Sequence, residues 1–254
     1  MTRSAPPHEL RLDHAALFLD LDGTLAPFCN TPDGVGPDAR RNGLLRELAR
    51  RLNGRLAVIS GRSIADLDRI LAGSVLCVAG SHGLQRRDAR GHVMAAPVHP
   101  GVQVATDAFE DFAGQRPGVL VERKPLSVAL HYRNAPQAEG DVQALALELA
   151  RATGLKLQLG ACVAELVTLG ADKGQALNAF MREAPFTGAS PVFVGDDLTD
   201  EDGFRAAVDL SGYGVLVGPP RPTRAQCRLD SSAAVIDWLQ GLLAAEHLSL
   251  ECVQ

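Results

Sequence analysis

The segment LFLDLDGTLAPF, residues 17–28, joins an apolar run directly to two aspartates spaced two positions apart. Side chains two positions apart lie on the same side of a strand, so we expect Asp20 and Asp22 to share a small region where a buried strand ends. Two carboxylates held that close repel each other unless a cation, a shared proton or water relieves the repulsion. A turn or helix cap is the plainer alternative, and it explains one such aspartate better than two followed by Gly23 and Thr24.

Short apolar runs alternate with helical patterns on both sides of a different middle section. Continuously apolar runs are typical of strands that are buried on both faces. Their alternation with helices predicts right-handed βαβ units and a parallel sheet covered by helices on both faces, an α/β fold. The expected strands are residues 15–20, 55–60, 75–80, 191–197 and 213–218. The expected helices are residues 37–53, 63–73, 173–184, 199–210 and 231–246.

The middle of the chain has the order β-α-β-β-α-β-β, which indicates an antiparallel α+β module inserted into the parallel domain. We therefore predict a core made of residues 1–83 and 170–254, with an inserted domain at 84–169. The predicted elements are a hairpin at 85–94, helices at 102–114 and 137–154, a strand pair within 118–134 broken near Pro125, and a second pair within 155–169 turning at Gly160.

Composition excludes several classes of protein. The chain has 254 residues, 46% hydrophobic and 22% charged, which is ordinary for a soluble globular protein. A net charge of -5 and the lack of a Lys/Arg run argue against nucleic-acid binding. We expect no membrane partner, because there is neither a signal peptide nor an apolar run of about 18 residues. Five scattered cysteines without a CxxC pair indicate neither a disulfide framework nor a zinc site, which fits a cytoplasmic location.

A second polar signal lies in VISGRS, residues 58–63, at the end of another expected strand. Ligands of open α/β sheets bind outside the carboxyl ends of the strands. Ser60 and the backbone N–H groups after it are therefore candidates for holding a phosphate. The alternative is that Ser63 merely caps the helix that follows.

Two further signals lie near the end of the chain. In GADKGQAL, Lys173 opens a helix, where a cation is disfavoured; a solvated surface lysine is the alternative. In VFVGDDLTDEDGF, five acidic residues follow a buried strand: Asp196, Asp197, Asp200, Glu201 and Asp202. Capping needs fewer acids, and hard oxygen ligands of this kind suit magnesium.

The four signals in this order, DxDGT, S, K and GDDxxxD, resemble the signature motifs of the haloacid dehalogenase (HAD) superfamily of phosphatases. The resemblance implies a HAD-like Rossmannoid core with an inserted cap of the C2 type, and Mg²⁺ as cofactor. It implies Asp20 as nucleophile and Asp22 as general acid and base. Lys173 and Ser60 would hold the phosphoryl oxygens. The implied metal site is formed by Asp20, the backbone carbonyl of Asp22, Asp196 and Asp200, the last binding the metal directly or through water.

Four longer stretches resemble the trehalose-6-phosphate phosphatase family: GSHGLQ at 80–85, VERKPLSVALHYRNA at 121–135, AELVTLGADKG at 164–174 and GDDLTDED at 195–202. This resemblance implies that Glu122, Lys124 and Glu165 of the cap bind sugar hydroxyls. Arg62 and His82 would line the core side of the same site. The alternative for Glu122 and Lys124 is an exposed strand face.

Other functions remain open at this stage. A HAD phosphatase for sucrose 6-phosphate or mannosyl-3-phosphoglycerate would share every catalytic residue. An acidic substrate such as a phosphoglycerate would require an additional cluster of basic side chains. The candidates, Arg86, Arg87 and Arg90, lie near a predicted turn and are expected to be solvated. A non-catalytic HAD module would have lost its nucleophile, which this chain retains. We expect a monomer that acts on a small sugar phosphate.

Overall fold

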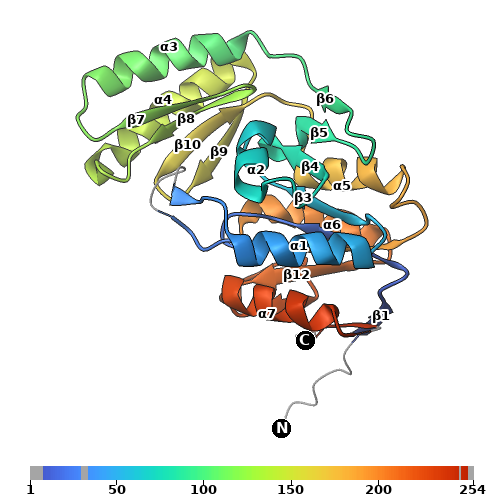
Figure 1. The fold of residues 1–254 in the computed structure, drawn as a ribbon. Coiled ribbons are helices and arrows are strands. Elements are labelled where there is room, and N and C mark those ends of the chain that lie inside the picture. The colour runs from blue at the N-terminus through green and yellow to red at the C-terminus, as the bar shows by residue number, and fades with distance from the viewer. Residues whose placement is uncertain (1–7, 30–33, 246, 251–254) are drawn as a thin grey trace. The chain divides into compact units, whose positions relative to one another are not determined.

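The computed structural model describes residues 8–29, 34–245 and 247–250, and it divides the chain into two compact units (Figure 1). The core unit runs up to Met94 and resumes at Asp172, and the inserted unit is Ala95–Ala171. The sequence predicted the first boundary at residue 84, whereas the structure places it ten residues or so further on. The second boundary lies two residues from the predicted position.

The core unit is built on an eight-stranded sheet in which the first six strands of the spatial order are parallel. In that order the strands are β13 (Cys227–Leu229), β12 (Tyr213–Val217), β11 (Ser190–Gly195), β2 (Ala15–Leu19), β3 (Leu56–Ile59), β4 (Cys77–Gly80), β5 (Gln85–Arg87) and β6 (Val93–Ala95). The strand order reverses around β2, because β11 and β3 flank it on opposite sides. Ligands of such sheets bind at the point where the order reverses, beyond the carboxyl ends of the strands.

Successive residues of a strand point to opposite faces of the sheet. Apolar side chains therefore lie on both faces, and helices cover both. On β2, Leu17 and Leu19 pack into one hydrophobic cluster with the first, second and last helices, whereas Phe18 packs into the other cluster with Phe180 and Phe204. The helices of the core unit are α1 (Ala39–Arg51), α2 (Ile64–Leu71), α5 (Lys173–Met181), α6 (Glu201–Asp209) and α7 (Ser232–Leu242). The predicted parallel sheet and all five predicted core helices are confirmed.

Local capping residues define where these helices begin. Asp38, Ser63, Asp172 and Ser231 each accept a hydrogen bond from a backbone N–H in the first turn of α1, α2, α5 and α7, respectively. Such caps satisfy N–H groups that have no partner within the helix. Ser63 therefore does cap α2, as the plainer reading of VISGRS proposed.

The predicted hairpin at 85–94 exists, but it belongs to the core sheet. β5 pairs antiparallel with β4, and Asp88 and His92 close the turn through a backbone hydrogen bond of 3.1 Å. The guanidinium of Arg86 forms two hydrogen bonds, of 2.7 and 2.8 Å, with the carboxylate of Glu183. Arg86 is thus buried and paired rather than solvated, which corrects the expectation from the sequence.

The inserted unit is an antiparallel four-stranded sheet with two helices on one face. Its spatial strand order is β7 (Leu120–Lys124), β8 (Ser127–His131), β10 (Val163–Val167) and β9 (Lys156–Gly160). Helices α3 (Gly101–Gly114) and α4 (Glu139–Thr153) share a hydrophobic cluster with the sheet. The predicted break near Pro125 and the turn after Gly160 are confirmed. The predicted first strand of this module is instead part of the core hairpin.

The remaining strands, β1 (His8–Arg11) and β14 (His247–Leu250), pair antiparallel near the two ends of the chain. Cys227 of β13 is disulfide-bonded, although the spacing of the cysteines indicated no disulfide framework. Cys29, Cys77 and Cys162 are free thiols, and Cys252 lies outside the described residues.

Among the helices of the described segments, none is both long and apolar enough to span a bilayer.

Candidate active site

Asp20 follows β2 directly, and the next residues form a tight loop around Gly23. The backbone N–H of Asp20 bonds the carbonyl of Val194 on β11, at 2.9 Å, which brings the two strand ends together. Gly23 has a φ of +84°, and a Cβ there would lie 2.3 Å from a carboxylate oxygen of Asp196. Only glycine accommodates both the backbone conformation and this close approach. The buried hydroxyl of Thr24 donates to Asp196 Oδ1 at 3.0 Å.

Lys173 is buried at the start of α5, with 3% of its surface exposed. Its Nζ donates to Asp20 Oδ1 at 2.8 Å and to Asp200 Oδ1 at 2.6 Å. The helix N-terminus disfavours a cation, so the two carboxylates supply the compensating interaction. The alternative of a solvated surface lysine is therefore wrong.

Asp200 organises the loop that follows β11. It lies in η4 (Leu198–Asp200) and is fully buried. While its Oδ1 accepts from Lys173, its Oδ2 accepts the backbone N–H groups of Asp196, at 3.0 Å, and Asp197, at 2.9 Å. Both oxygens of Asp200 thus have protein donors, which orient the loop that carries Asp196.

The electrostatics of this cluster are those of crowded carboxylates. Burial, followed by the charges of Asp200 and Asp196, raises the pKa of Asp20 well above its usual value, although Lys173 opposes the shift. Burial and the charge of Asp200 raise the pKa of Asp196 to about 7. The pKa of Lys173 is raised despite its burial, because Asp20 and Asp200 stabilise the ammonium. The site therefore has more negative charge than Lys173 alone balances.

The donor set fits a divalent cation. One carboxylate oxygen from each of Asp20, Asp196 and Asp200 lies within 4.8 Å of the others. Three carboxylates and one ammonium leave two negative charges, which a divalent ion would balance. All the donors are hard oxygens, the ligand type that Mg²⁺ prefers.

The loop after β3 lies at the same edge of the sheet. Ser60 is buried, and its Oγ accepts the backbone N–H of Arg62 at 3.2 Å. The backbone of η2 (Ser81–Gly83) holds this loop, because Ser81 N–H bonds the Arg62 carbonyl at 2.8 Å and His82 N–H bonds the Ser60 carbonyl at 3.0 Å. A Cβ on Gly61 would lie 2.7 Å from Nε2 of His82, so the imidazole packs directly on the glycine.

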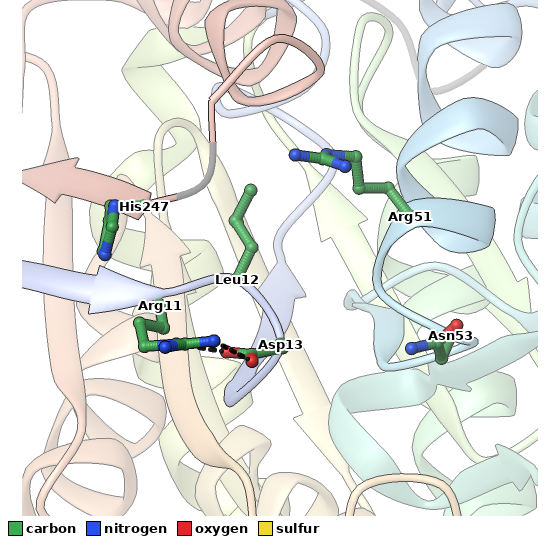
Figure 2. Close-up of a pocket in the computed structure, with 6 residues that line it drawn as sticks. All are labelled: Arg11, Leu12, Asp13, Arg51, Asn53 and His247. Carbon is green, nitrogen blue, oxygen red and sulfur yellow. Dashed lines mark hydrogen bonds and ion pairs between the residues drawn. The ribbon is translucent and has the colours of Figure 1, made fainter.

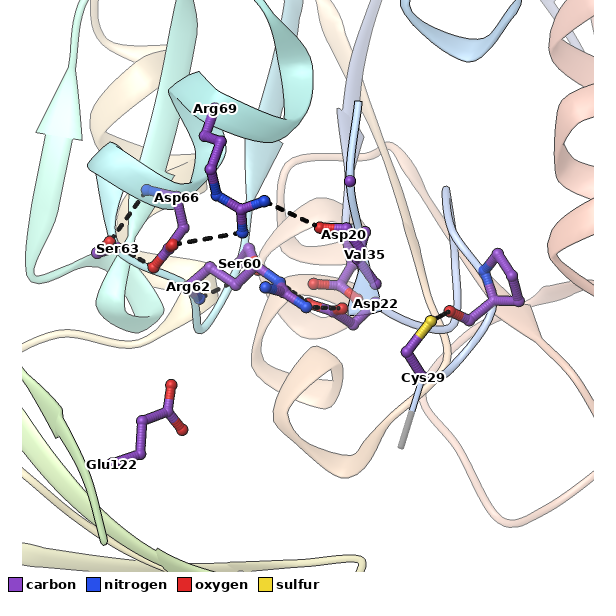
Figure 3. Close-up of polar contacts among 12 residues, drawn as sticks. Asp20, Asp22, Cys29, Val35, Ser60, Arg62, Ser63, Asp66, Arg69 and Glu122 are labelled. Atoms are coloured by element: carbon purple, nitrogen blue, oxygen red, sulfur yellow. Dashed lines mark hydrogen bonds and ion pairs between the residues drawn. The ribbon is translucent and has the colours of Figure 1, made fainter. Parts of the chain in front are cut away.

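Arg62 and Asp22 form a two-pronged ion pair (Figure 3). Arg62 Nε lies 2.6 Å from Asp22 Oδ2, and a terminal guanidinium nitrogen lies 2.7 Å from Oδ1. The side chains are 13% and 29% exposed, so the pair is partly desolvated. Such a fork fixes the orientation of the carboxylate.

The predicted residues of the inserted unit form a second polar cluster on the sheet face opposite the helices. Glu165 Oε1 accepts from Lys124 at 3.0 Å and from the buried Ser127 hydroxyl at 2.6 Å. Glu122 lies 2.8 Å from the His131 ring nitrogen and 3.8 Å from Lys124. Burial raises the pKa of Glu122, but the hydrogen bond from His131 and the charge of Lys124 outweigh it and lower the pKa overall.

The exposed fractions of these side chains are 30% for Glu122, 16% for Lys124 and 11% for Glu165. The three residues are thus connected to one another and partly shielded from water. Gln158 is paired with Glu165 in the β9–β10 register, and its buried Oε1 has no hydrogen-bond partner among the described residues. A buried acceptor of this kind suits a hydroxyl donor.

A pocket of about 330 Å³ lies elsewhere in the core unit (Figure 2). It lies before the first residues of β2 and β3, and so at the amino ends of the parallel strands. Its lining residues are Arg11, Leu12, Asp13, Arg51, Asn53 and His247. None of the predicted site residues lines it.

The trehalose-phosphatase family model matches residues 18–233, which include every predicted site residue. The chain belongs to the trehalose-phosphatase family. It is 42% identical over 234 residues to the trehalose-6-phosphate phosphatase of Escherichia coli K12, covering 91% of this chain and 87% of the relative. It is 35% identical over 236 residues to a probable trehalose-phosphate phosphatase of Sinorhizobium fredii, covering 92% and 88%. The protein is a phosphatase.

Solved structures agree with this family assignment at the level of the fold. The C-terminal domain of the Candida albicans trehalose-6-phosphate phosphatase has a TM-score of 0.80 at 22% identity, covering 91% of this chain and 93% of that domain. A HAD-like hydrolase from Bacteroides thetaiotaomicron has a TM-score of 0.65 at 16% identity, covering 90% and 99%. The predicted HAD-like fold is confirmed.

The eleven predicted site residues thus fall into two clusters, one in each unit. Sequence reasoning gave no role to Thr24, Gly61, Ser127 or His131, which contact the predicted residues directly. Thr24 and Gly61 lie inside the quoted motifs and could have been found there. Ser127 and His131 reach their partners only through strand pairing.

Proposed function

We propose that the chain hydrolyses trehalose 6-phosphate to trehalose and inorganic phosphate through an aspartyl-phosphate on Asp20. The observation that carries this proposal is the buried cluster in which Lys173 Nζ bonds both Asp20, at 2.8 Å, and Asp200, at 2.6 Å, within a chain of this family. The ammonium holds Asp20 Oδ1, which leaves Oδ2 to approach phosphorus.

In the first half-reaction, a carboxylate oxygen of Asp20 attacks phosphorus, and the bond from phosphorus to the sugar O6 breaks. Asp22 gives a proton to O6 as trehalose leaves. Because Asp22 is held by the guanidinium of Arg62, it can act only after that ion pair opens. The phosphoryl oxygens are the obvious replacement partner for Arg62, since they match the same planar fork.

In the second half-reaction, Asp22 takes a proton from water, which attacks the phosphorus of the aspartyl-phosphate. Phosphate then leaves, and the Asp20 carboxylate is restored. Ser60 and Lys173 hold the phosphoryl oxygens through both steps. Their burial keeps these interactions strong, because little water competes for them.

We propose that the metal is Mg²⁺. Its ligands would be Asp20, Asp196 and the backbone carbonyl of Asp22. Asp200 would act through water, because both its oxygens already accept protein donors. When bound, the ion balances the charge of the carboxylates and of the phosphoryl group.

The sugar is assigned to the polar cluster of the inserted unit. The many hydroxyls of an uncharged disaccharide would form hydrogen bonds with Glu122, Lys124 and Glu165. Gln158 joins this set as a further acceptor. A phosphoglycerate-type substrate is less well supported, because Arg86 and Arg87 are engaged by Glu183 and Asp68.

The test is phosphate release from a panel of sugar phosphates, with Mg²⁺ and with EDTA. Trehalose 6-phosphate should give the highest kcat/KM, and EDTA should abolish turnover. The Asp20→Asn variant should lose steady-state turnover while keeping the melting temperature of the wild type, because the side-chain volume barely changes. Substantial steady-state turnover by that variant would remove Asp20 as the nucleophile, and a preference for sucrose 6-phosphate would reassign the substrate.

A further inference from the structure

We propose that Arg221, with Glu201, positions the metal-binding loop Asp196–Asp197 and thereby sets the affinity of the site for Mg²⁺. Neither residue has a role in the mechanism above. The inference rests on the proposed function, because it takes the metal to lie at Asp20 and Asp196.

Arg221 lies in the loop after β12, far along the chain from the residues it contacts. A terminal guanidinium nitrogen lies 2.9 Å from the backbone carbonyl oxygen of Asp197 and 3.5 Å from that of Asp196. The side chain is 23% exposed. Arg221 therefore holds the loop by its carbonyl groups, whereas Asp200 holds the same two residues by their N–H groups.

Glu201 orients Arg221 in turn. Its Oε1 is paired with the Arg221 guanidinium and accepts the Thr223 hydroxyl at 2.8 Å. Its Oε2 accepts the backbone N–H of Arg224, also at 2.8 Å. Three donors thus hold the Glu201 carboxylate, and they fix its orientation toward Arg221.

This arrangement matters because the peptide groups of Asp196 and Asp197, together with the Thr24 hydroxyl, set the direction of the Asp196 carboxylate. Asp196 directly follows β11, and no regular strand hydrogen bonds fix the peptide groups beyond Gly195. A loop held on one side only would allow the carboxylate to reorient. Partners that orient a metal ligand typically change metal affinity by about 10–100-fold when they are removed.

Arg221 could affect Mg²⁺ affinity by positioning the loop or simply by its charge, and the two effects can be told apart. A guanidinium near a cation site repels the cation, so its removal should strengthen Mg²⁺ binding if charge alone matters. If Arg221 positions the loop, its removal should weaken binding. The two explanations therefore predict changes of opposite sign.

The experiment is calorimetric titration of metal-free protein with MgCl₂, without substrate, on wild type, Arg221→Gln and the control Arg224→Gln. The control removes the same charge nearby, but it keeps the backbone N–H that Glu201 accepts. We expect Arg221→Gln to raise the Kd for Mg²⁺ about tenfold. Arg224→Gln should stay within about twofold of the wild type.

Two further variants make the result robust. Arg221→Lys keeps the charge but loses the fork, so its Kd should lie between those of the wild type and Arg221→Gln; it also serves if Arg221→Gln fails to fold. Glu201→Gln should weaken binding, and the double variant Arg221→Gln/Glu201→Gln should be little worse than Arg221→Gln alone, since the two residues act as a unit. The stabilisation of the melting temperature by Mg²⁺ should follow the same order.

The outcomes distinguish the two proposals. If the wild type does not bind Mg²⁺, the proposed metal site is wrong. If the wild type binds Mg²⁺ and both Arg221 variants bind it as tightly or more tightly, the positioning role of Arg221 is overturned while the metal site stands.

Discussion

At the scale of single residues, the active-site edge depends on a few close approaches that allow no larger side chain. Gly23 makes room for the Asp196 carboxylate, and Gly61 makes room for the His82 ring. In each case a Cβ would lie within 3 Å of the neighbouring side chain. The functional groups are therefore positioned by residues that carry no chemistry themselves.

The pair Arg62–Asp22 leads to a prediction at this scale. Arg62→Lys should lower kcat/KM for trehalose 6-phosphate about tenfold or more, because one ammonium cannot replace the two bonds of the guanidinium fork. Steady-state phosphate release measures the effect. The matched control is Arg69→Lys, since Arg69 is half exposed and pairs with Asp66 rather than with a predicted site residue. Wild-type kinetics in the Arg62 variant would show that the fork has no part in turnover.

At the scale of secondary-structure elements, one ion pair explains why the hairpin at 85–94 belongs to the core. Arg86 of β5 reaches Glu183, just after α5, and its guanidinium lies 5.0 Å from the centre of the Phe180 ring. Phe180 also packs against Phe18 and Phe186. The hairpin is thus attached to a helix that comes almost 100 residues later, a contact that local sequence patterns do not reveal.

The same pair predicts how stability depends on pH. The hydrogen bond from Arg86 lowers the pKa of Glu183 in the folded state below its ordinary value of 4.5. Its contribution is therefore complete above the unfolded-state pKa and is lost as the pH falls through the lowered folded-state pKa. Glu183→Gln should cost about 0.5–1 kcal/mol of unfolding free energy at pH 7, a small value because the Glu183 side chain is 42% exposed.

Urea denaturation at pH 7 and below pH 4.5 measures this difference between wild type and variant. The difference should shrink as the solution is acidified. Glu47→Gln is the control, because Glu47 pairs with Arg50 on the exposed face of α1 and should contribute little at either pH. A cost for Glu183→Gln that does not change with pH would mean that the carboxylate charge is not the source of the stabilisation.

At the scale of the whole molecule, the two units have separate hydrophobic cores and separate polar clusters. The core unit carries the carboxylates and Lys173, and the inserted unit carries Glu122, Lys124, Glu165 and Gln158. Under the proposed function, the chemistry belongs to the core unit and the recognition of the sugar to the inserted unit.

The corresponding prediction compares two substrates on the same protein preparations. Glu165→Gln and Lys124→Met should each lower kcat/KM for trehalose 6-phosphate at least tenfold, since a hydrogen bond to a charged group contributes about 1.5–3 kcal/mol. Activity towards p-nitrophenyl phosphate, which has no sugar, should change little. Glu148→Gln, a change on α4 outside the polar cluster, is the control. Equal losses on both substrates would instead mean that these residues support the fold of the inserted unit.

The sequence patterns alone predict the parallel core, its five helices and the meeting of the acidic motifs at one edge of the sheet. These follow from local patterns, because apolar periodicity sets each element and the ends of parallel strands meet at one edge of the sheet. Three further features follow from packing: the hairpin joins the core, Lys173 lies between Asp20 and Asp200, and Arg221 reaches the Asp197 carbonyl. These contacts join residues that are distant along the chain, so they depend on packing rather than on any local propensity.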